Sequence, residues 1–172
     1  MNLLVPESAF VRRFRKNRLD PFPIGNDNSS RMGSEHKIKS EQNTQNAAKL
    51  RDLDIEIRFL EGILESDPQY IEALEAIASD YTERGLYKKG LEADLRLTAL
   101  KPKDPLAHYN LGCSYSLTGQ EEKSADTLET AILLGYNDFD YMDKDPDLNN
   151  LRAHPAYQKI DFLKKIHNKK HS

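Results

Sequence analysis

The sequence predicts an all-α protein made of stacked antiparallel helix pairs, with a capping helical segment after them and a disordered tail before them. Three observations carry this prediction. Apolar residues recur every three or four positions from about residue 50 onward, residues thirty-four apart repeat in type, and the first 46 residues are polar and basic. A length of 172 residues suits one domain with a tail, and the mean hydropathy of -0.74 is low for a globular chain.

Residues 1–46 are expected to form the disordered basic tail. Residues 1–49 carry nine Lys or Arg and five Asp or Glu, whereas residues 50–172 carry sixteen and twenty-three. The stretch from Pro21 to Asn46 has too few apolar residues to offset the entropy of ordering it. The first twenty residues are consistent with a solvated tail, a nucleic-acid-binding patch, a membrane-surface helix or an organelle transit peptide. The expected cytoplasmic location therefore has an organelle alternative.

A repeat domain is expected over residues 47–168. Each of its hairpins consists of two helices joined near a glycine, Gly85 in the first and Gly119 in the second. Asp104 followed by Pro105 suits a helix start, because Asp can cap the first free N–H groups and proline fits the first helical position. The expected elements are a preceding helix at 50–66, hairpins at about 71–102 and 105–136, and a C-terminal cap at 137–168.

A spacing of 34 residues relates the two hairpins. The recurrence covers helix, turn, helix and closing turn in order, so helical periodicity alone does not account for it. The matched pairs are Pro68 and Pro102, Ile77 and Leu111, Ala78 and Gly112, Tyr81 and Tyr115, Gly85 and Gly119, Gly90 and Ser124, and Leu100 and Leu134.

These residues resemble the motifs of the tetratricopeptide-repeat family. The family motif W-x2-L-G-x2-Y reads His108-x2-Leu111-Gly112-x2-Tyr115 here, and more weakly Leu74-x2-Ile77-Ala78-x2-Tyr81. In the second helix, Ser124-x3-Leu128 followed by Ala131 resembles A-x3-F. The resemblance covers residues 71–136, and Tyr136 stands where the closing proline of the family would fall. It implies a short right-handed superhelix of antiparallel helix pairs with a concave groove that binds a protein or peptide.

Asp94 departs from the family pattern, because an apolar ring is usual at its position. Either the helix is rotated so that Leu91 and Leu95 take the inward positions, or Asp94 is buried with a hydrogen-bonding partner. The second alternative is favoured, and the candidate partners are His108, Tyr109 and Asn110.

Residues 137–168 resemble the terminal segment of many bacterial repeat proteins. There, short helices follow turns of the types G-Y-x-D-F and D-P-D-L-x-x-L-R, which this chain carries from Gly135 and from Asp145. The Asp residues are expected to cap short helices, while Tyr141, Leu148, Leu151 and Tyr157 cover the last hairpin. A calcium loop started at Asp143 would need Gly and Glu where Leu148 and His154 stand, so no metal site is expected.

No catalytic or cofactor-binding constellation is expected either. A single cysteine, Cys113, excludes an internal disulfide framework and a multi-cysteine zinc site. His108 lies five residues before Cys113, so the two do not share a helix face. The chain has no phosphate-binding loop, no dinucleotide-binding glycine motif and no H-E-x-x-H. These observations favour a function that is not enzymatic.

The resemblance implies that the peptide-binding groove lies on the first helix of each hairpin. An acidic half and a half with aromatic and amide groups suit an extended peptide carrying Lys or Arg, with Tyr109 as the anchor and Asn110 bonding its backbone. The basic segment Arg12–Arg18 is a candidate self-ligand for the same groove. The predicted site residues are Glu72, Glu75, Ser79, Thr82, Tyr109, Asn110, Cys113 and Ser116, with Ala76, Glu83, Leu106 and Leu117 beside them.

We therefore expect an adaptor or assembly factor that binds a protein or peptide. The first alternative is a nucleic-acid- or membrane-associated protein that acts through the basic tail. The second is a structural subunit of a larger complex that uses the convex face. No transmembrane segment is expected, because no apolar run approaches the roughly 18 residues that a membrane helix needs. The partner and the oligomeric state stay open.

Overall fold

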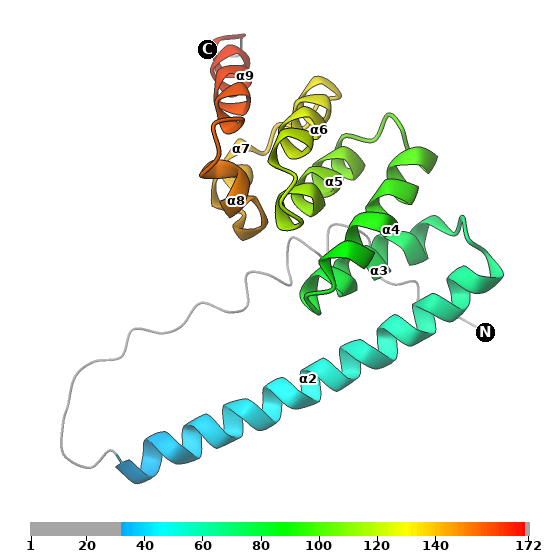
Figure 1. Cartoon of the computed structure of the whole chain (residues 1–172), viewed down its shortest axis with the longest axis vertical. Helices are drawn as coiled ribbons and strands as arrows, with labels where there is room; N and C mark the ends of the chain where they lie inside the picture. The colour runs from blue at the N-terminus through cyan, green and yellow to red at the C-terminus, as the bar shows by residue number, and fades with distance from the viewer. Residues whose placement is uncertain (1–31, 171–172) are drawn as a thin grey trace.

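The computed structural model describes residues 32–170, and every regular element in that range is a helix (Figure 1). The predicted all-α class is thereby confirmed for this part of the chain. None of the helices within it is both long and apolar enough to cross a membrane. The elements are α2 (Met32–Ser66), α3 (Ile71–Glu83), α4 (Tyr87–Leu100), α5 (Pro105–Leu117), α6 (Glu121–Leu133), α7 (Phe139–Lys144), the 3₁₀ helix η2 (Pro146–Leu148), α8 (Asn149–Arg152) and α9 (Tyr157–Lys170).

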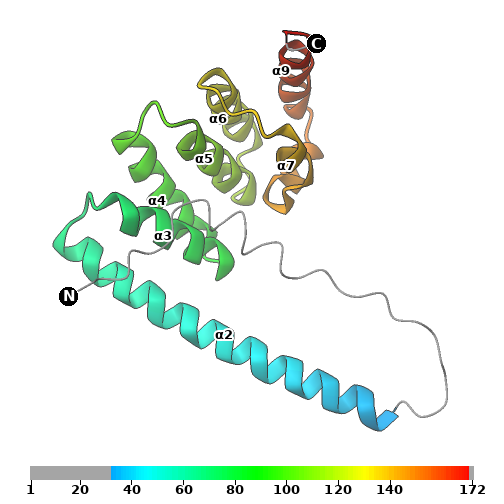
Figure 2. The same ribbon diagram turned by 180° about the vertical axis from the view of Figure 1, so that it is seen from behind.

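Consecutive helices pack in pairs, α3 with α4 and α5 with α6, while α2 packs on α3 and α4 on α5. Gly85 and Gly119 end the first helix of each pair with positive φ angles of 80° and 72°. Other residues rarely adopt this conformation, which lets the chain reverse within a few residues. Figures 1 and 2 show from opposite sides that α3, α4, α5 and α6 follow one another along the stack. The arrangement is compatible with a helical repeat.

Gly112 allows the second pair to pack closely. A Cβ atom at this position would lie 2.7 Å from two side-chain carbons of Leu128 on α6. Next to this contact, the hydroxyl of Ser124 donates a hydrogen bond of 2.7 Å to the carbonyl of Gly112. The separation of α5 and α6 therefore depends on the missing side chain.

Helix α2 is longer than the sequence predicted. The helix that was expected to start at residue 50 starts at Met32, so α2 includes residues 32–46 of the predicted tail. Leu53, Ile57 and Leu60 are buried and hold the second half of α2 against the stack. Adding turns to a helix that is already formed costs less than starting one. Residues 1–31, which include most of the predicted tail, lie outside the described range.

Two apolar clusters fill the interior. One joins α2, α3 and α4, and the other joins α5 and α6 to the segment from α7 to α9. Leu60, Leu74 and Ile77 are the largest buried side chains of the first cluster, and the second is centred on Leu128, Met142, Leu148, Leu151 and Ile160. The C-terminal segment thus contributes apolar side chains to the second core.

Asp94 is completely buried on α4, and the hydroxyl of Ser114 on α5 donates a hydrogen bond to its Oδ2. Leu95 is exposed, so the alternative of a rotated helix is wrong. The expectation of a buried, hydrogen-bonded carboxylate is confirmed. The hydrogen bond, however, comes from a residue that was not among the three predicted candidates. The Ser114 hydroxyl on the neighbouring helix thus pairs with a polar side chain at a position where an apolar ring is usual.

Candidate binding surface

The predicted groove residues of α3 lie on an accessible face. Glu72 is exposed, and Glu75, Ser79 and Thr82 are half-buried. The hydroxyl of Thr82 donates a hydrogen bond of 3.0 Å to the carbonyl of Ala78, its own helix partner. The sequence prediction thus places Glu72, Glu75 and Ser79 where a partner could reach them, whereas the Thr82 hydroxyl serves its own helix.

Two lysines already pair with carboxylates of this face. Lys101 Nζ lies 3.0 Å from Oε1 of Glu75, and Lys49 Nζ lies 2.7 Å from Oε1 of Glu83. Lys101 also pairs with Asp104, whose hydrogen bond is the main reason that the pKa of Lys101 is raised. The acidic half of the groove is therefore partly neutralised by residues of the same chain.

Four predicted groove residues of α5 are buried, which corrects the expectation that they are exposed, whereas Leu106 at the start of α5 is exposed. Tyr109 and Cys113 each expose 3% of their surface, Asn110 exposes 8% and Ser116 none. The covering residues are those of the C-terminal segment, whose Met142, Leu148 and Leu151 belong to the same apolar cluster as Tyr109 and Cys113. This half of the predicted groove is filled by the protein itself.

Asp145 is the polar centre of this filled half. Its Oδ2 accepts a hydrogen bond of 2.8 Å from the hydroxyl of Tyr109 and lies 3.6 Å from the Cys113 sulfur, which also donates to it. The Tyr109 ring stacks on Tyr136, with centroids 4.2 Å apart and planes at 4°. Burial, more than any neighbouring charge, raises the pKa of Tyr109 far above its usual range, so its hydroxyl stays protonated and donates.

Asp145 also caps the next helical turn, because its Oδ1 accepts the backbone N–H of Asp147 at 3.0 Å. Ser116 accepts two hydrogen bonds from residues further along the same C-terminal segment. Its carbonyl accepts from Asn150 Nδ2 at 3.2 Å, and its hydroxyl oxygen accepts from the N–H of Leu151 at 3.4 Å. The side chains predicted to hold a foreign peptide thus hold residues 145–151.

The sequence contained part of this result. The D-P-D-L turn predicted correctly that Leu148 and Leu151 pack on the last hairpin. It did not show which face of the hairpin they cover, and Asp145 and Tyr136 were not singled out for the groove. A signal existed in the buried-type residues Tyr109 and Cys113 on α5, which a solvated groove would not need.

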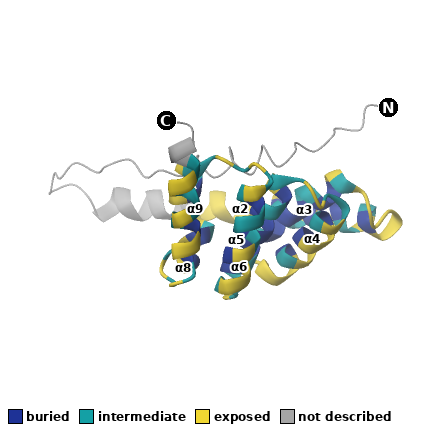
Figure 3. Cartoon of the chain, turned by 90° about the horizontal axis from the view of Figure 1, so that it is seen from above, coloured by how far each residue is buried: buried dark blue, intermediate teal, exposed yellow. Residues whose placement is uncertain are grey.

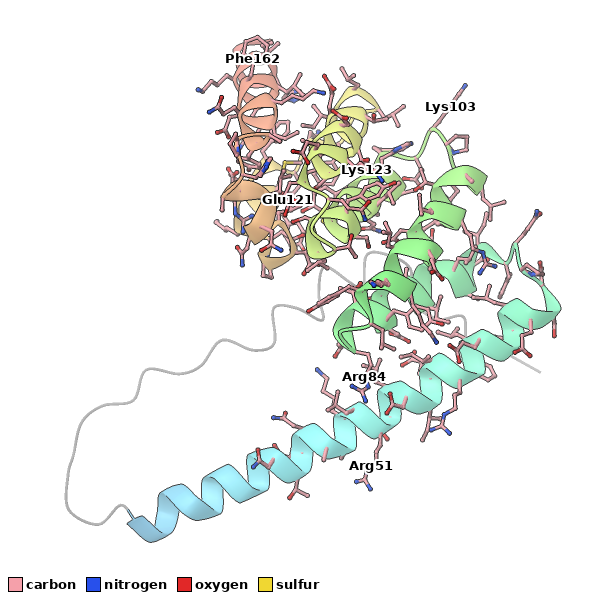
Figure 4. The ribbon with its side chains drawn as sticks, in the orientation of Figure 1. Arg51, Arg84, Lys103, Glu121, Lys123 and Phe162 are labelled. Carbon is pink, nitrogen blue, oxygen red and sulfur yellow. The ribbon has the colours of Figure 1, made fainter. Side chains whose placement is uncertain are left out.

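Helix α2 presents a second accessible face, on the side opposite its buried stripe. Ile55 and Phe59 are each 62% exposed there, and Gly62 follows one turn later. In Figure 4, Arg51 points away from the helix stack, whereas Arg84 reaches from the end of α3 toward α2. Arg84 Nε donates to Asp54 Oδ1 at 2.7 Å, which fixes α2 beside α3. In Figure 3 the stretch of α2 beside its label is coloured as exposed.

An open cleft of about 450 Å³ lies where α2, α3 and α4 meet. Glu61 is its central carboxylate, since it accepts from the Tyr81 hydroxyl at 2.7 Å and from Lys89 Nζ at 2.9 Å. These two hydrogen bonds, that of Lys89 first, hold the pKa of Glu61 below its ordinary value. The cleft is lined by Glu61, Leu64, Glu65, Ile77, Tyr81, Lys89, Glu92, Ala93 and Arg96. The sequence did not predict it.

Reactive side chains are not brought together in the described part of the chain. The Cys113 thiol is buried against Asp145, and His108 Nε2 lies 3.0 Å from the carbonyl of Pro102. Within the same range, no three His, Cys, Asp or Glu side chains are grouped as metal ligands would be. What this arrangement offers is an accessible surface for contact.

No family model matches the chain. It is similar to a protein of Arabidopsis thaliana whose name describes it as chloroplastic, with 35% identity over 75 residues. The match covers 42% of this chain and 22% of that protein, so the chain spans only about a fifth of the relative's length.

Proposed function

We propose that this chain is a non-catalytic protein- or peptide-binding module that acts as an adaptor or assembly factor. We further propose that its hairpins form a short right-handed superhelix of the tetratricopeptide type. Support comes from the helix pairing together with the 34-residue recurrence of Gly85 and Gly119 at the hairpin turns. A stack of this kind offers one continuous surface to a partner.

The observation that carries the proposal is the difference between the two halves of the predicted groove. The half on α5 is closed by residues 145–151, while the face of α3 around Glu72 and Ser79 is accessible. A partner is therefore expected along α3, and contact with Tyr109 or Cys113 is not expected. The polar groups around Asp145 hydrogen-bond within the protein and hold its C-terminal segment in place. This supports a binding role over a catalytic one.

The expected partner carries Lys or Arg. Glu72 is an exposed carboxylate on α3, and Glu75 and Glu83 lie on the same helix. Because Lys101 and Lys49 already pair with Glu75 and Glu83, a cation of the partner would exchange with them. We expect charge to contribute modestly, at about 1 kcal/mol or less per exposed pair, and binding to weaken as salt is added.

The test compares two variants of the full chain that share spacing and charge change. Glu72→Lys with Ser79→Arg places cations seven residues apart on α3, and Glu92→Lys with Ala99→Arg does the same on the exposed face of α4. Each is used to capture partners from native extract, with mass spectrometry as the readout and circular dichroism as the check of folding. Partners lost only with the α3 variant support the proposal.

Two other outcomes count against it. If partners are lost only with the α4 variant, the protein contacts them through its other face, as a structural subunit would. If neither variant changes the captured set, the α3 surface is not the binding site.

The predicted cytoplasmic location has not gained support. The name of the Arabidopsis protein places that relative in the chloroplast, and this favours the organelle alternative for the present chain. A fusion of residues 1–46 to a fluorescent protein, imaged in plant cells, would test it, because a transit peptide suffices to direct a foreign protein to the organelle.

A further inference from the structure

Helix α2 occupies the position of a second helix in a hairpin whose first helix is missing from residues 32–66. Along the 34-residue spacing, Leu60 on α2 corresponds to Asp94 on α4 and Leu128 on α6. All three are buried, with at most 2% exposed. The residues that would form a first helix, 37–49 by the same spacing, belong to the uninterrupted helix α2. Nothing from residues 32–66 therefore turns back to cover α2.

The same spacing identifies the uncovered face. On α4, Ala93 and Leu97 are buried, and Gly90 packs against Ala78, Tyr81 and Thr82 of its own first helix. The residues 34 positions before Ala93 and Leu97 are the large apolar Phe59 and Ile63. Yet Phe59 is 62% exposed, while Ile63 is half-buried at the edge of the first apolar cluster.

Ile55 extends this stripe by one turn, since it lies four residues before Phe59. An apolar stripe at the position where the other hairpins carry a helix is a surface that a helix would cover. We call this stripe of Ile55, Phe59 and Ile63 the α2 face.

We propose that residues 6–19 of the same chain dock on the α2 face and take the place of the missing first helix. In the sequence, Phe10 and Phe14 are four residues apart, with Val11 beside them. This spacing puts the two aromatic rings on one side of a helix, as it does for Ile55 and Phe59. Pro6 is compatible with the first turn of a helix.

Charge favours this occupant. Residues 1–20 carry five Arg or Lys and two Asp or Glu, a balance of +3, whereas residues 50–66 carry two and five, a balance of -3. The first sum counts Arg12, Arg13, Arg15, Lys16 and Arg18 against Glu7 and Asp20. The second counts Arg51 and Arg58 against Asp52, Asp54, Glu56, Glu61 and Glu65. Opposite balances attract over about a Debye length, roughly 8–10 Å at ordinary ionic strength.

The connecting chain is long enough. From residue 32 to Phe59 the helix rises by about 40 Å, at roughly 1.5 Å per residue. Residues 20–31, which lie between the docked segment and α2, can span up to about 40 Å when extended, at roughly 3.3 Å per residue. The segment therefore reaches the α2 face when it runs antiparallel to α2, as the first helix of a hairpin would, because residue 19 then lies nearer to residue 32 than Phe14 does. This inference concerns α2 and is independent of the proposed partner surface on α3.

A single tryptophan tests the proposal, because the natural chain has none. Phe59→Trp in the full chain places the reporter on the α2 face, and Ile55→Trp is a second reporter one turn away. In each background, Phe10→Asp with Phe14→Asp removes the apolar side of the segment. Asn2→Asp with Asn17→Asp makes the same charge change and keeps both phenylalanines. Acrylamide quenching and the emission maximum are measured over a range of protein concentrations, together with the mass by light scattering.

We expect a shielded, blue-shifted tryptophan in the full chain and in the Asn2, Asn17 control. Replacing Phe10 and Phe14 should shift the emission to longer wavelength and increase quenching. Equal quenching with and without the two phenylalanines would overturn the proposal. So would shielding that rises with protein concentration and accompanies a doubled mass, because a second copy would then cover the face. A native protein whose intact mass shows that residues 1–19 have been removed would also overturn it.

Discussion

The hydroxyl of Ser114 and the carboxylate of Asp94 form a buried hydrogen bond that joins α4 to α5. Asp94 occupies a position that Leu60 and Leu128 fill with apolar side chains 34 residues before and after it. At this position of the stack the chain thus replaces a hydrophobic contact by a polar one. A buried carboxylate of this kind stabilises only while its donors remain in place.

Removing the Ser114 hydroxyl alone should therefore lower the free energy of unfolding more than replacing both Ser114 and Asp94 by apolar residues. We expect Ser114→Ala to lower the free energy of unfolding by about 1–3 kcal/mol, since a buried carboxylate loses a donor. Asp94→Leu with Ser114→Ala should regain most of that loss, because an apolar side chain then fills the site. Urea unfolding of the full chain measures both variants. If Ser114→Ala and Asp94→Ala leave stability unchanged, the hydrogen bond is not a structural element.

Replacing Gly112 or Gly62 by alanine should change the stability of the protein in opposite directions, because only Gly112 lies against another side chain. Gly112→Ala should lower stability by about 1–3 kcal/mol, because the new Cβ would overlap the Leu128 side chain. Gly62→Ala on α2 has nothing within 4 Å of its new methyl group and should raise stability by about 0.5–1 kcal/mol. Thermal unfolding distinguishes the two, and a loss at both positions would show that helix propensity is not the controlling factor at Gly62.

The hydrogen bond from Tyr109 to Asp145 predicts a local effect on the C-terminal segment. Tyr109→Phe keeps the stacking on Tyr136 and removes one donor to a buried carboxylate, which should cost about 1–3 kcal/mol. Limited proteolysis should then cut residues 139–151 sooner than in the natural chain. Tyr87→Phe, at an exposed tyrosine, is the matched control. Identical cleavage in all three proteins would mean that the segment is held by apolar burial alone.

The pKa of Glu61 predicts a pH dependence. Hydrogen bonds from Lys89 and then Tyr81 lower it from its ordinary value of 4.5. Because the pKa of Glu61 is lower in the folded than in the unfolded state, its ionised carboxylate stabilises the fold at pH values above the unfolded pKa. This contribution is lost as the pH falls below about 4.5 and through the folded pKa. Between about pH 6 and pH 3, the free energy of unfolding should decrease less steeply for Glu61→Gln than for the natural chain. The neighbouring exposed Glu65→Gln serves as control, and equal slopes for Glu61→Gln and the natural chain would refute the assignment.

Local patterns in the sequence predicted several features because each depends on near neighbours. The glycines at 85 and 119 predicted the helix ends, since a positive φ angle favours this residue type. Asp104 predicted its cap, and its side chain accepts from the N–H groups of Leu106 and Ala107. The start of α2 at Met32 was not predicted, because composition does not register that a packed helix can extend into a polar stretch.

The sequence by itself determined the helical class and the spacing of its turns, because these follow from periodicity and from the conformational limits of single residues. Only the tertiary structure decided that residues 145–151 lie on α5, that Ser114 is the donor to Asp94, and that α2 is straight. These outcomes depend on which surfaces meet when distant segments pack. The periodicity of the sequence indicates which face of a helix is buried, but it does not show which other segment covers that face.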